Sequence, residues 1–264
     1  MIVGHIIRMN KGDTKGFPSM DIYLNNLLYS LLMTRLGLGE NDEIRFYVDD
    51  TAEEFIKYTM DVPDSRIFKE EIRGMDDGVT DTVVAIMLAG GHSMYLPERF
   101  VFLSDAIYLE NVKGIDRSKS MYFIQSIPWK SAFADERIKA AHESLSKWRS
   151  MESMKNDVPY FHCSLLGGIS SPVWIEMANT IMVKENNAAT MNEYEASLFV
   201  SHYLSKMVDL CECTLDRQCI RVPPLKRGKD PDTYVGDIRL ELRARFKTES
   251  KRLEEYMTEK RIFR

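Results

Sequence analysis

The residue best placed to do chemistry is Asp105, which stands within the mainly apolar run Phe100–Leu109. A run of apolar, strand-forming residues predicts a strand that is buried on both faces. A single carboxylate in such a run contributes nothing to packing. In open α/β sheets, ligands bind beyond the carboxyl ends of the strands. Asp105 is therefore the first candidate for a contact with a ligand.

Strands and helices alternate over the first 110 residues, and this order decides where Asp105 lies. The patterns predict a strand at Ile2–Met9, an amphipathic helix at Leu24–Leu36 stopped by Gly37 and Gly39, a strand at Glu43–Val48, a helix at Thr51–Tyr58 capped by Asp50 or Thr51, and a helix within Asp76–Gly91. The run from Phe100 follows as the next strand. Such alternation indicates an α/β fold with a mainly parallel sheet covered by helices on both faces.

Further strands and helices are expected in the second half of the chain. We expect a strand at Met121–Ile124, a helix at Ile138–Trp148, a strand at Pro159–Gly168 that closes in a glycine pair, a helix from Pro172 capped by Ser171, and a helix after a capping box at Thr190–Glu193. The tail at 237–260 fits an amphipathic helix with a basic outer face, and its local alternation also allows a strand.

Composition and charge limit the classes of protein. The chain has 264 residues, 44% of them hydrophobic and 28% charged, so it is long enough to bury a core. A net charge of -5 argues against a protein held to nucleic acid by bulk electrostatics. Residues 216–264 hold 14 Lys and Arg against 9 Asp and Glu, a net charge of +5, which leaves -10 for residues 1–215. The C-terminal segment is therefore the part expected to meet an anion.

Several motifs are absent from the sequence. There is no Gly-x-Gly-x-x-Gly after a strand, no Walker loop and no Gly-x-Ser-x-Gly, which argues against dinucleotide-binding enzymes of the usual type, P-loop NTPases and hydrolases with a nucleophile elbow. No apolar run approaches the length of a membrane span, and no signal peptide is recognisable. We expect a cytoplasmic protein, in the host cytoplasm if it is viral.

The order of elements and two motifs resemble a known family. A strand ending in Asp49-Asp50 and a later strand ending in Leu103-Ser104-Asp105 look like the nucleotide-sugar half of a GT-A glycosyltransferase. The stretch Tyr160–Gly168, followed by a helix with Trp174 and a further helix with Glu195, is similar to the acceptor-side motifs of family-6 retaining glycosyltransferases, the blood-group and α-1,3-galactosyl type. The resemblance covers most of residues 1–215, and the lack of a membrane anchor points to a soluble bacterial or viral form.

The resemblance implies roles for particular residues. On the donor side, Ile6, Ile7 and Arg8 would lie beside the nucleotide base and ribose of a UDP-sugar. On the acceptor side, the pocket would be shaped by His162, Gly167, Gly168 and Trp174. Glu195 matches the glutamate next to the anomeric carbon, where a carboxylate stabilises oxocarbenium character or acts as a transient nucleophile. That role fits the positive charge which develops as the nucleotide leaves.

The expected metal site departs from the family pattern. Asp105 would be the last residue of Asp-x-Asp, which holds Mn²⁺ or Mg²⁺ on the donor diphosphate, but Leu103 occupies the first position. One carboxylate is a weak site for these ions, which take several oxygen ligands. Without the metal, the leaving diphosphate needs other cations, which Lys226 and Arg227, Lys229, or the tail arginines 261 and 264 could supply.

The resemblance implies a glycosyltransferase that moves a sugar from a nucleotide-sugar to a hydroxyl acceptor with retention. Its catalytic domain would span residues 1–215, with a nucleotide-sugar half at 1–110 and an acceptor half at 111–215, followed by a basic segment at 216–264. Two alternatives stay open: a nucleotidyltransferase, which the glycine- and lysine-containing loop Lys11–Gly16 keeps possible, and a non-catalytic interaction protein of the same fold. The acceptor could be a saccharide, a protein, a lipid or a hydroxylated base in DNA.

Overall fold

The structure of the chain is a computed structural model. The described residues are 1–9, 19–73, 75, 78–92, 99–104, 107–109, 121–148, 151, 158–169, 172–184, 191–205, 212–214, 219–221 and 240–260. Asp105, Lys226 and Arg227 lie outside these ranges, as do Lys229, the tail arginines 261 and 264 and the loop Lys11–Gly16. The predictions that depend on them stay predictions.

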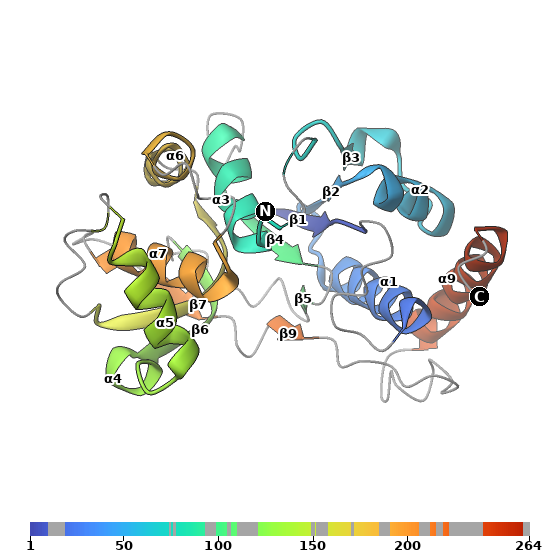
Figure 1. Cartoon of the computed structure of the whole chain (residues 1–264). Helices are drawn as coiled ribbons and strands as arrows, with labels where there is room; N and C mark the ends of the chain where they lie inside the picture. Colours follow the sequence, from blue (N-terminus) through green and yellow to red (C-terminus); the bar gives the residue numbers. More distant parts are fainter. Residues whose placement is uncertain are drawn as a thin grey trace. The chain divides into compact units, whose positions relative to one another are not determined.

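Strands and helices alternate over residues 2–104, and their order is mixed in the described residues beyond (Figure 1). The strands are β1 Ile2–Ile7, β2 Glu43–Val48, β3 Ile67–Phe68, β4 Arg99–Ser104, β5 Ile107–Leu109, β6 Met121–Pro128, β7 Tyr160–Ile169, β8 Glu212–Thr214 and β9 Cys219–Arg221. The helices are α1 Met20–Gly37, α2 Asp50–Thr59, α3 Asp81–His92, α4 Trp129–Ala132, α5 Glu136–Leu145, α6 Pro172–Asn179, α7 Glu193–Ser205 and α9 Leu240–Glu259, with a 3₁₀ turn at Asp64–Arg66 and a π-helical turn at Thr180–Lys184.

The central sheet confirms the predicted mixed α/β fold with mostly parallel strands. Seven strands are hydrogen-bonded in the order β3-β2-β1-β4-β7-β6-β8, and β5 pairs with β9 in a separate two-stranded sheet. The pairs β2/β3 and β6/β8 are parallel, whereas β7 runs antiparallel to both of its neighbours, β4 and β6. The order of the strands in the sheet reverses at β1. The strands that follow it in the chain, β2 and β3, lie on one side of β1, and the next strand, β4, lies on the other side.

The chain divides into two compact units, each described here by itself. The first unit comprises Met1–Val3, Gly74–Phe102 and Ile115–Arg217, and the second comprises Gly4–Arg73, Leu103–Gly114 and Gln218–Arg264.

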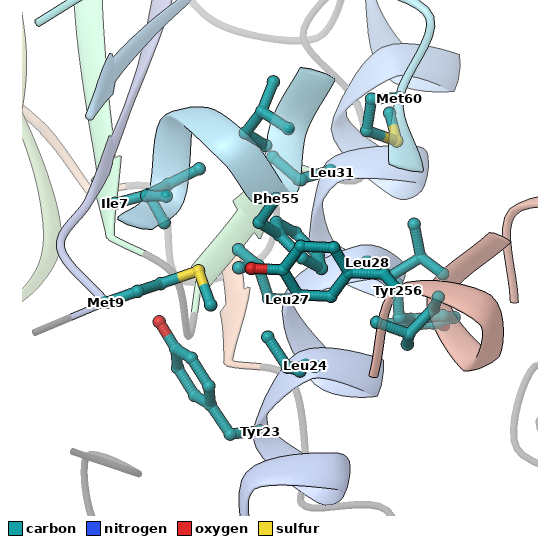
Figure 2. Packing of buried hydrophobic residues seen from close by; sticks show 14 of the residues in the cluster. Ile7, Met9, Tyr23, Leu24, Leu27, Leu28, Leu31, Phe55, Met60 and Tyr256 are labelled. Atoms are coloured by element: carbon teal, nitrogen blue, oxygen red, sulfur yellow. The ribbon is translucent and has the colours of Figure 1, made fainter. Parts of the chain in front are cut away.

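The second unit has a core in which α1, α2 and α9 pack together (Figure 2). Tyr256 of α9 lies edge-on to Phe55 of α2, with ring centroids 5.7 Å apart, and Phe246 meets Tyr29 of α1 at 6.0 Å. The tail is thus helical, as one of the two readings predicted, and its apolar side is buried. Within α9 itself, five Lys and Arg stand against five Glu, so the basic excess of 216–264 lies outside this helix.

The first unit depends on close backbone contacts at two glycines. A Cβ at Gly90 of α3 would lie 2.3 Å from Cβ of Ala178 in α6. A Cβ at Gly167 of β7 would lie 2.0 Å from the carbonyl oxygen of Phe100 in β4. Both distances are far shorter than any van der Waals contact, so only glycine fits where α3 meets α6 and where β7 meets β4.

Several expectations about these elements were wrong. The run Phe100–Leu109 is not one strand, because β4 ends at Ser104 and β5 pairs with β9 in the other sheet. The glycine pair Gly167-Gly168 does not close a strand in a turn but lies inside β7, paired with both β4 and β6. Helix α2 is capped by Asp49, whose carboxylate accepts the N–H of Ala52 at 2.7 Å, rather than by Asp50 or Thr51.

Helix α1 also differs from the expected amphipathic pattern. Its polar residues Asn26, Ser30 and Thr34, spaced four apart, are fully buried. The leucines from Leu24 to Leu32 are buried as well, whereas Leu36, at the end of the predicted apolar pattern, is 43% exposed. Asn26 satisfies its amide N–H by donating to the carbonyl of Ile22 at 2.8 Å. The helix is therefore enclosed on the side that the sequence pattern assigned to solvent.

Across the described helices, none combines the length and apolar character that crossing a lipid bilayer requires.

Candidate functional site

The first group of candidate residues lies at the carboxyl end of β1, in the second unit. Ile6 and Ile7 are buried in the core, and Arg8, the residue after them, is 8% exposed. The carbonyl of Ile7 accepts the N–H of Asp49, which follows β2, at 3.3 Å. The carboxyl ends of β1 and β2 therefore lie at the same edge of the sheet. A donor contact would come from Arg8 or from backbone groups, since the two isoleucine side chains pack inward, and this role stays a prediction.

His5, also on β1, is a buried titratable group that the sequence patterns did not single out. Its side chain is fully buried, and neither ring nitrogen has a hydrogen-bond partner among the residues that the structure describes. The ring stacks on Phe46 of β2 with centroids 6.3 Å apart. Burial lowers the pKa of His5 from 6.5 to about 3, so the imidazole is neutral at pH 7.

The expected metal ligand Asp105 falls just past the end of β4, whose last described residues are Leu103 and Ser104. Leu103, at the first position of the expected Asp-x-Asp, is fully buried. Among the described residues no group of three or more His, Cys, Asp or Glu side chains is arranged to hold a metal ion. The described part of the chain therefore offers no cluster of three such side chains that could hold Mn²⁺ or Mg²⁺ without ligands from a donor diphosphate or water.

The second group of candidates lies in the first unit, on and around β7. His162 is 5% exposed, and its Nδ1 lies 2.7 Å from Oγ of Ser126, directly across from it on β6. Its backbone N–H donates to Oγ of Ser201 in α7 at 2.8 Å, and that hydroxyl donates to the carbonyl of Ser197. Burial lowers the pKa of His162 to about 4. The imidazole is therefore neutral at pH 7 and fixed by both a strand and a helix.

Gly167, Gly168 and Trp174 meet at the strand β4. Gly168 pairs with Phe100, and Gly167 with the next residue, Val101. Trp174 is fully buried, with its ring centroid 5.0 Å from that of Phe100. The two glycines take part in strand pairing and the Trp174 ring packs on Phe100. The role of these residues at an acceptor stays a prediction.

Glu195 lies in the first turn of α7, where it forms a capping box. Oδ1 of Asn192 accepts the N–H groups of Tyr194 and Glu195, each at 3.0 Å, and Oε2 of Glu195 accepts the N–H of Asn192 at 2.9 Å. The box thus begins at Asn192, two residues after the position that the sequence patterns favoured. The spacing Asn-x-x-Glu is itself a capping-box signal, so sequence analysis could have found it.

A second contact holds the same turn of α7. Glu193 accepts a hydrogen bond from the hydroxyl of Thr82, which is 3% exposed in the first turn of α3. The carboxylate of Glu193 is thereby placed near the positive ends of two helix dipoles, where a negative charge is favoured. The turn that carries Glu195 is therefore anchored both to its own cap and to a neighbouring helix. Local spacing in the sequence could not predict this contact, because Thr82 and Glu193 are 111 positions apart in the chain.

Comparisons with known proteins find likenesses in structure alone. No model of a known protein family matches the chain, and neither does any curated protein. The bifunctional glycosyltransferase WbbM in its apo form is 10% identical, with a TM-score of 0.44, over 95% of this chain and 44% of that chain. An active-site mutant of LgtC is 11% identical, with a TM-score of 0.36, over 93% of this chain and all of that chain. This chain thus spans less than half the length of WbbM, and both TM-scores are below 0.5.

Proposed function

We propose that the chain is a glycosyltransferase that moves a sugar from a nucleotide-sugar, with a UDP-sugar as the first candidate, to a hydroxyl acceptor with retention. The observation that carries the proposal is the strand order around β1. In open α/β sheets, ligands bind where the strand order reverses, outside the carboxyl ends of the strands. In this sheet the reversal falls at β1, next to β4.

The residues that follow these two strands have the right chemistry for a nucleotide diphosphate. Arg8 comes directly after β1, and a guanidinium forms strong charge-assisted hydrogen bonds with phosphate oxygens. Asp105 comes directly after β4 and would add an oxygen ligand if a divalent ion accompanies the donor. Lys226 and Arg227 would supply further positive charge to the leaving group.

For the chemical step we propose Glu195 as the catalytic carboxylate. Its capping box fixes one oxygen against a backbone N–H, which restrains the side chain to one orientation. A restrained carboxylate stabilises positive charge at an anomeric carbon better than a mobile one, because it does not have to reorganise during the reaction. In a double displacement, the Glu195 carboxylate would attack the anomeric carbon while the bond from that carbon to the diphosphate breaks. The acceptor oxygen would then displace the carboxylate from the opposite face and give its proton to the released diphosphate, so that two inversions result in retention.

A thermal-shift panel tests the class of reaction. The full chain is melted with UDP, GDP, CMP, their sugars and nucleoside triphosphates, each with and without Mn²⁺, because a ligand that binds the folded state raises Tm by mass action. We expect a shift with one nucleoside diphosphate and its sugar. A response to triphosphates alone would favour a nucleotidyltransferase, and no response to any nucleotide would favour a non-catalytic interaction protein.

A further inference from the structure

The last turn of α1 and the first half of α9 bring together three arginines of the second unit, which we call the α1–α9 arginine cluster: Arg35, Arg245 and Arg252. The two helices pack on each other, with the rings of Tyr29 and Phe246 6.0 Å apart. Arg245 and Arg252 are seven positions apart, so they lie on one face of α9, about 10 Å apart along its axis. All three arginines are half-buried.

The hydrogen-bond donors of this cluster are largely unused. Glu249, which is 6% exposed, forms an ion pair with Arg252, but the atoms Oε2 and Nη1 are 3.5 Å apart and Oε2 has no hydrogen-bond partner among the described residues. Within the same described ranges, no hydrogen bond or ion pair joins the guanidinium of Arg35 or of Arg245 to another residue. Each guanidinium carries five N–H donors. The cluster can therefore bind a further group.

The cluster also holds like charges close together. Burial and the positive charge of Arg245 both lower the pKa of Arg35, while the carboxylates of Glu249 and Asp61 oppose this shift. Counting Arg252, three positive charges stand against two negative ones. Half-buried cations that repel each other destabilise the folded chain, and an anion bound between them removes that repulsion.

The order of charges along α9 also indicates an anion. Residues 240–252 contain five Lys or Arg and two Glu, whereas residues 253–259 contain three Glu and no Lys or Arg. The helix dipole favours the opposite order, with acidic residues near the N-terminus and basic residues near the C-terminus. The stability of the helix therefore does not explain its basic first half, whereas the binding of an anion there does.

The size of the anion follows from the second half of the helix. A polynucleotide that lay along α9 would continue from the basic half onto Glu254, Glu255 and Glu259, which are all exposed and would repel its phosphates. A compact anion contacts the basic half alone. Guanidinium groups bind phosphate oxygens with paired, charge-assisted hydrogen bonds. We propose that the α1–α9 arginine cluster binds a compact phosphate-class anion, either inorganic phosphate or the phosphate group of a small ester.

This site is separate from the residues proposed for the donor. Helix α2 connects the parallel strands β2 and β3, so it begins at the carboxyl end of β2 and ends near the start of β3. Asp49 caps the first turn of α2 beside the end of β1, whereas Asp61 follows its last turn. The ten residues of α2 hold these two positions about 15 Å apart. The inference therefore does not depend on the proposed function.

Isothermal titration calorimetry of the full chain tests the site, with inorganic phosphate and glycerol 3-phosphate as separate probes at constant ionic strength. We expect saturable binding of at least one probe. Arg35→Gln and Arg245→Gln should each weaken it about tenfold or more, and Arg245→Lys should weaken it less because the charge remains. Arg73→Gln is the matched control: it removes the same charge from the same unit, at a 63% exposed side chain paired with Glu70, and should leave Kd unchanged.

The Tm of each variant without phosphate shows that it is folded. Binding of either probe with this dependence on the arginines supports the site, and the tighter probe indicates whether the natural ligand is free phosphate or an ester. The site is overturned if neither probe binds saturably, or if both glutamine variants bind with the Kd of the wild type. Tighter binding of a duplex DNA fragment than of either probe would overturn the compact anion.

Discussion

Glu195 accepts the backbone N–H of Asn192 at 2.9 Å, so the proposed catalytic carboxylate also closes the capping box of its own helix. A structural role and a chemical role thus fall on one side chain. They can be separated because a capping box accepts glutamine as well as glutamate.

The first prediction concerns stability at this turn. Asn192→Ala removes the oxygen that accepts two N–H groups at the start of α7 and should cost about 1 kcal/mol of unfolding free energy. Asn192→Asp and Asn192→Ser should restore most of the loss, since both supply an acceptor at the cap. Urea unfolding of the three variants measures the difference. Equal stability of Asn192→Ala and the wild type would show that the box contributes nothing.

The second prediction concerns Gly167, which the family resemblance assigned to the acceptor pocket. Gly167→Ala would place a Cβ 2.0 Å from the carbonyl oxygen of Phe100, so β7 and β4 would have to separate. We expect a large loss of stability, of several kcal/mol, or failure to fold. Gly91→Ala is the matched control: its Cβ would meet nothing within 4 Å, so this change near the end of α3 should leave the stability close to that of the wild type. A folded Gly167→Ala protein of wild-type Tm would contradict the close approach.

The third prediction concerns acid sensitivity at His5. The unfolded chain binds a proton there near pH 6.5, whereas the folded chain binds one only near pH 3. The contribution to stability is therefore complete above pH 6.5 and falls as the pH drops, by roughly 2 kcal/mol at pH 5. His5→Leu should lose this part of the pH dependence, which denaturant unfolding at pH 7.5 and pH 5 would reveal. Identical pH dependence in the variant and the wild type would place the acid sensitivity elsewhere.

The fourth prediction concerns a buried carboxylate between α9 and its neighbours. Glu249 is 6% exposed, and burial raises its pKa although Arg252, Arg245 and Arg35 oppose the shift and Asp61 adds to it. A raised folded pKa means that stability is present below the unfolded pKa and is lost as the pH rises through the folded pKa. Glu249→Gln should therefore raise Tm at pH 7, and the difference should vanish near pH 4. A lower Tm at pH 7 would show that the ion pairs outweigh burial.

The sequence predicted the type of most elements because their signals are local. The apolar spacing of α1, the strand before Asp49 and the proline that opens α6 each depend on a few neighbouring residues. Non-local relationships escaped it. The predicted strand Phe100–Leu109 is divided after Ser104 because β5 pairs with β9, which lies more than 100 residues further along the chain. The polar side of α1 is buried because of packing within the second unit.

The candidate site shows the same division. The resemblance singled out His162, but its partners Ser126 and Ser201 come from other elements and carry no spacing signal. The same holds for Thr82, which bonds to Glu193 in the turn that carries Glu195. Gly167 was read as part of a turn because a glycine pair usually marks one, whereas the strand needs it for contact with Phe100. Glycine patterns alone do not distinguish these two uses.

The most direct test of the proposed function is the release of nucleoside diphosphate from a nucleotide-sugar, followed by NMR with wild type and Glu195→Gln. The wild type should release the nucleotide and transfer the sugar with retained anomeric configuration. Glu195→Gln should keep the wild-type Tm and donor shift, because the capping box survives, and should lose at least a hundredfold in kcat. A Glu195→Gln protein of unchanged kcat, or a wild type that consumes no donor in the panel, would contradict the account.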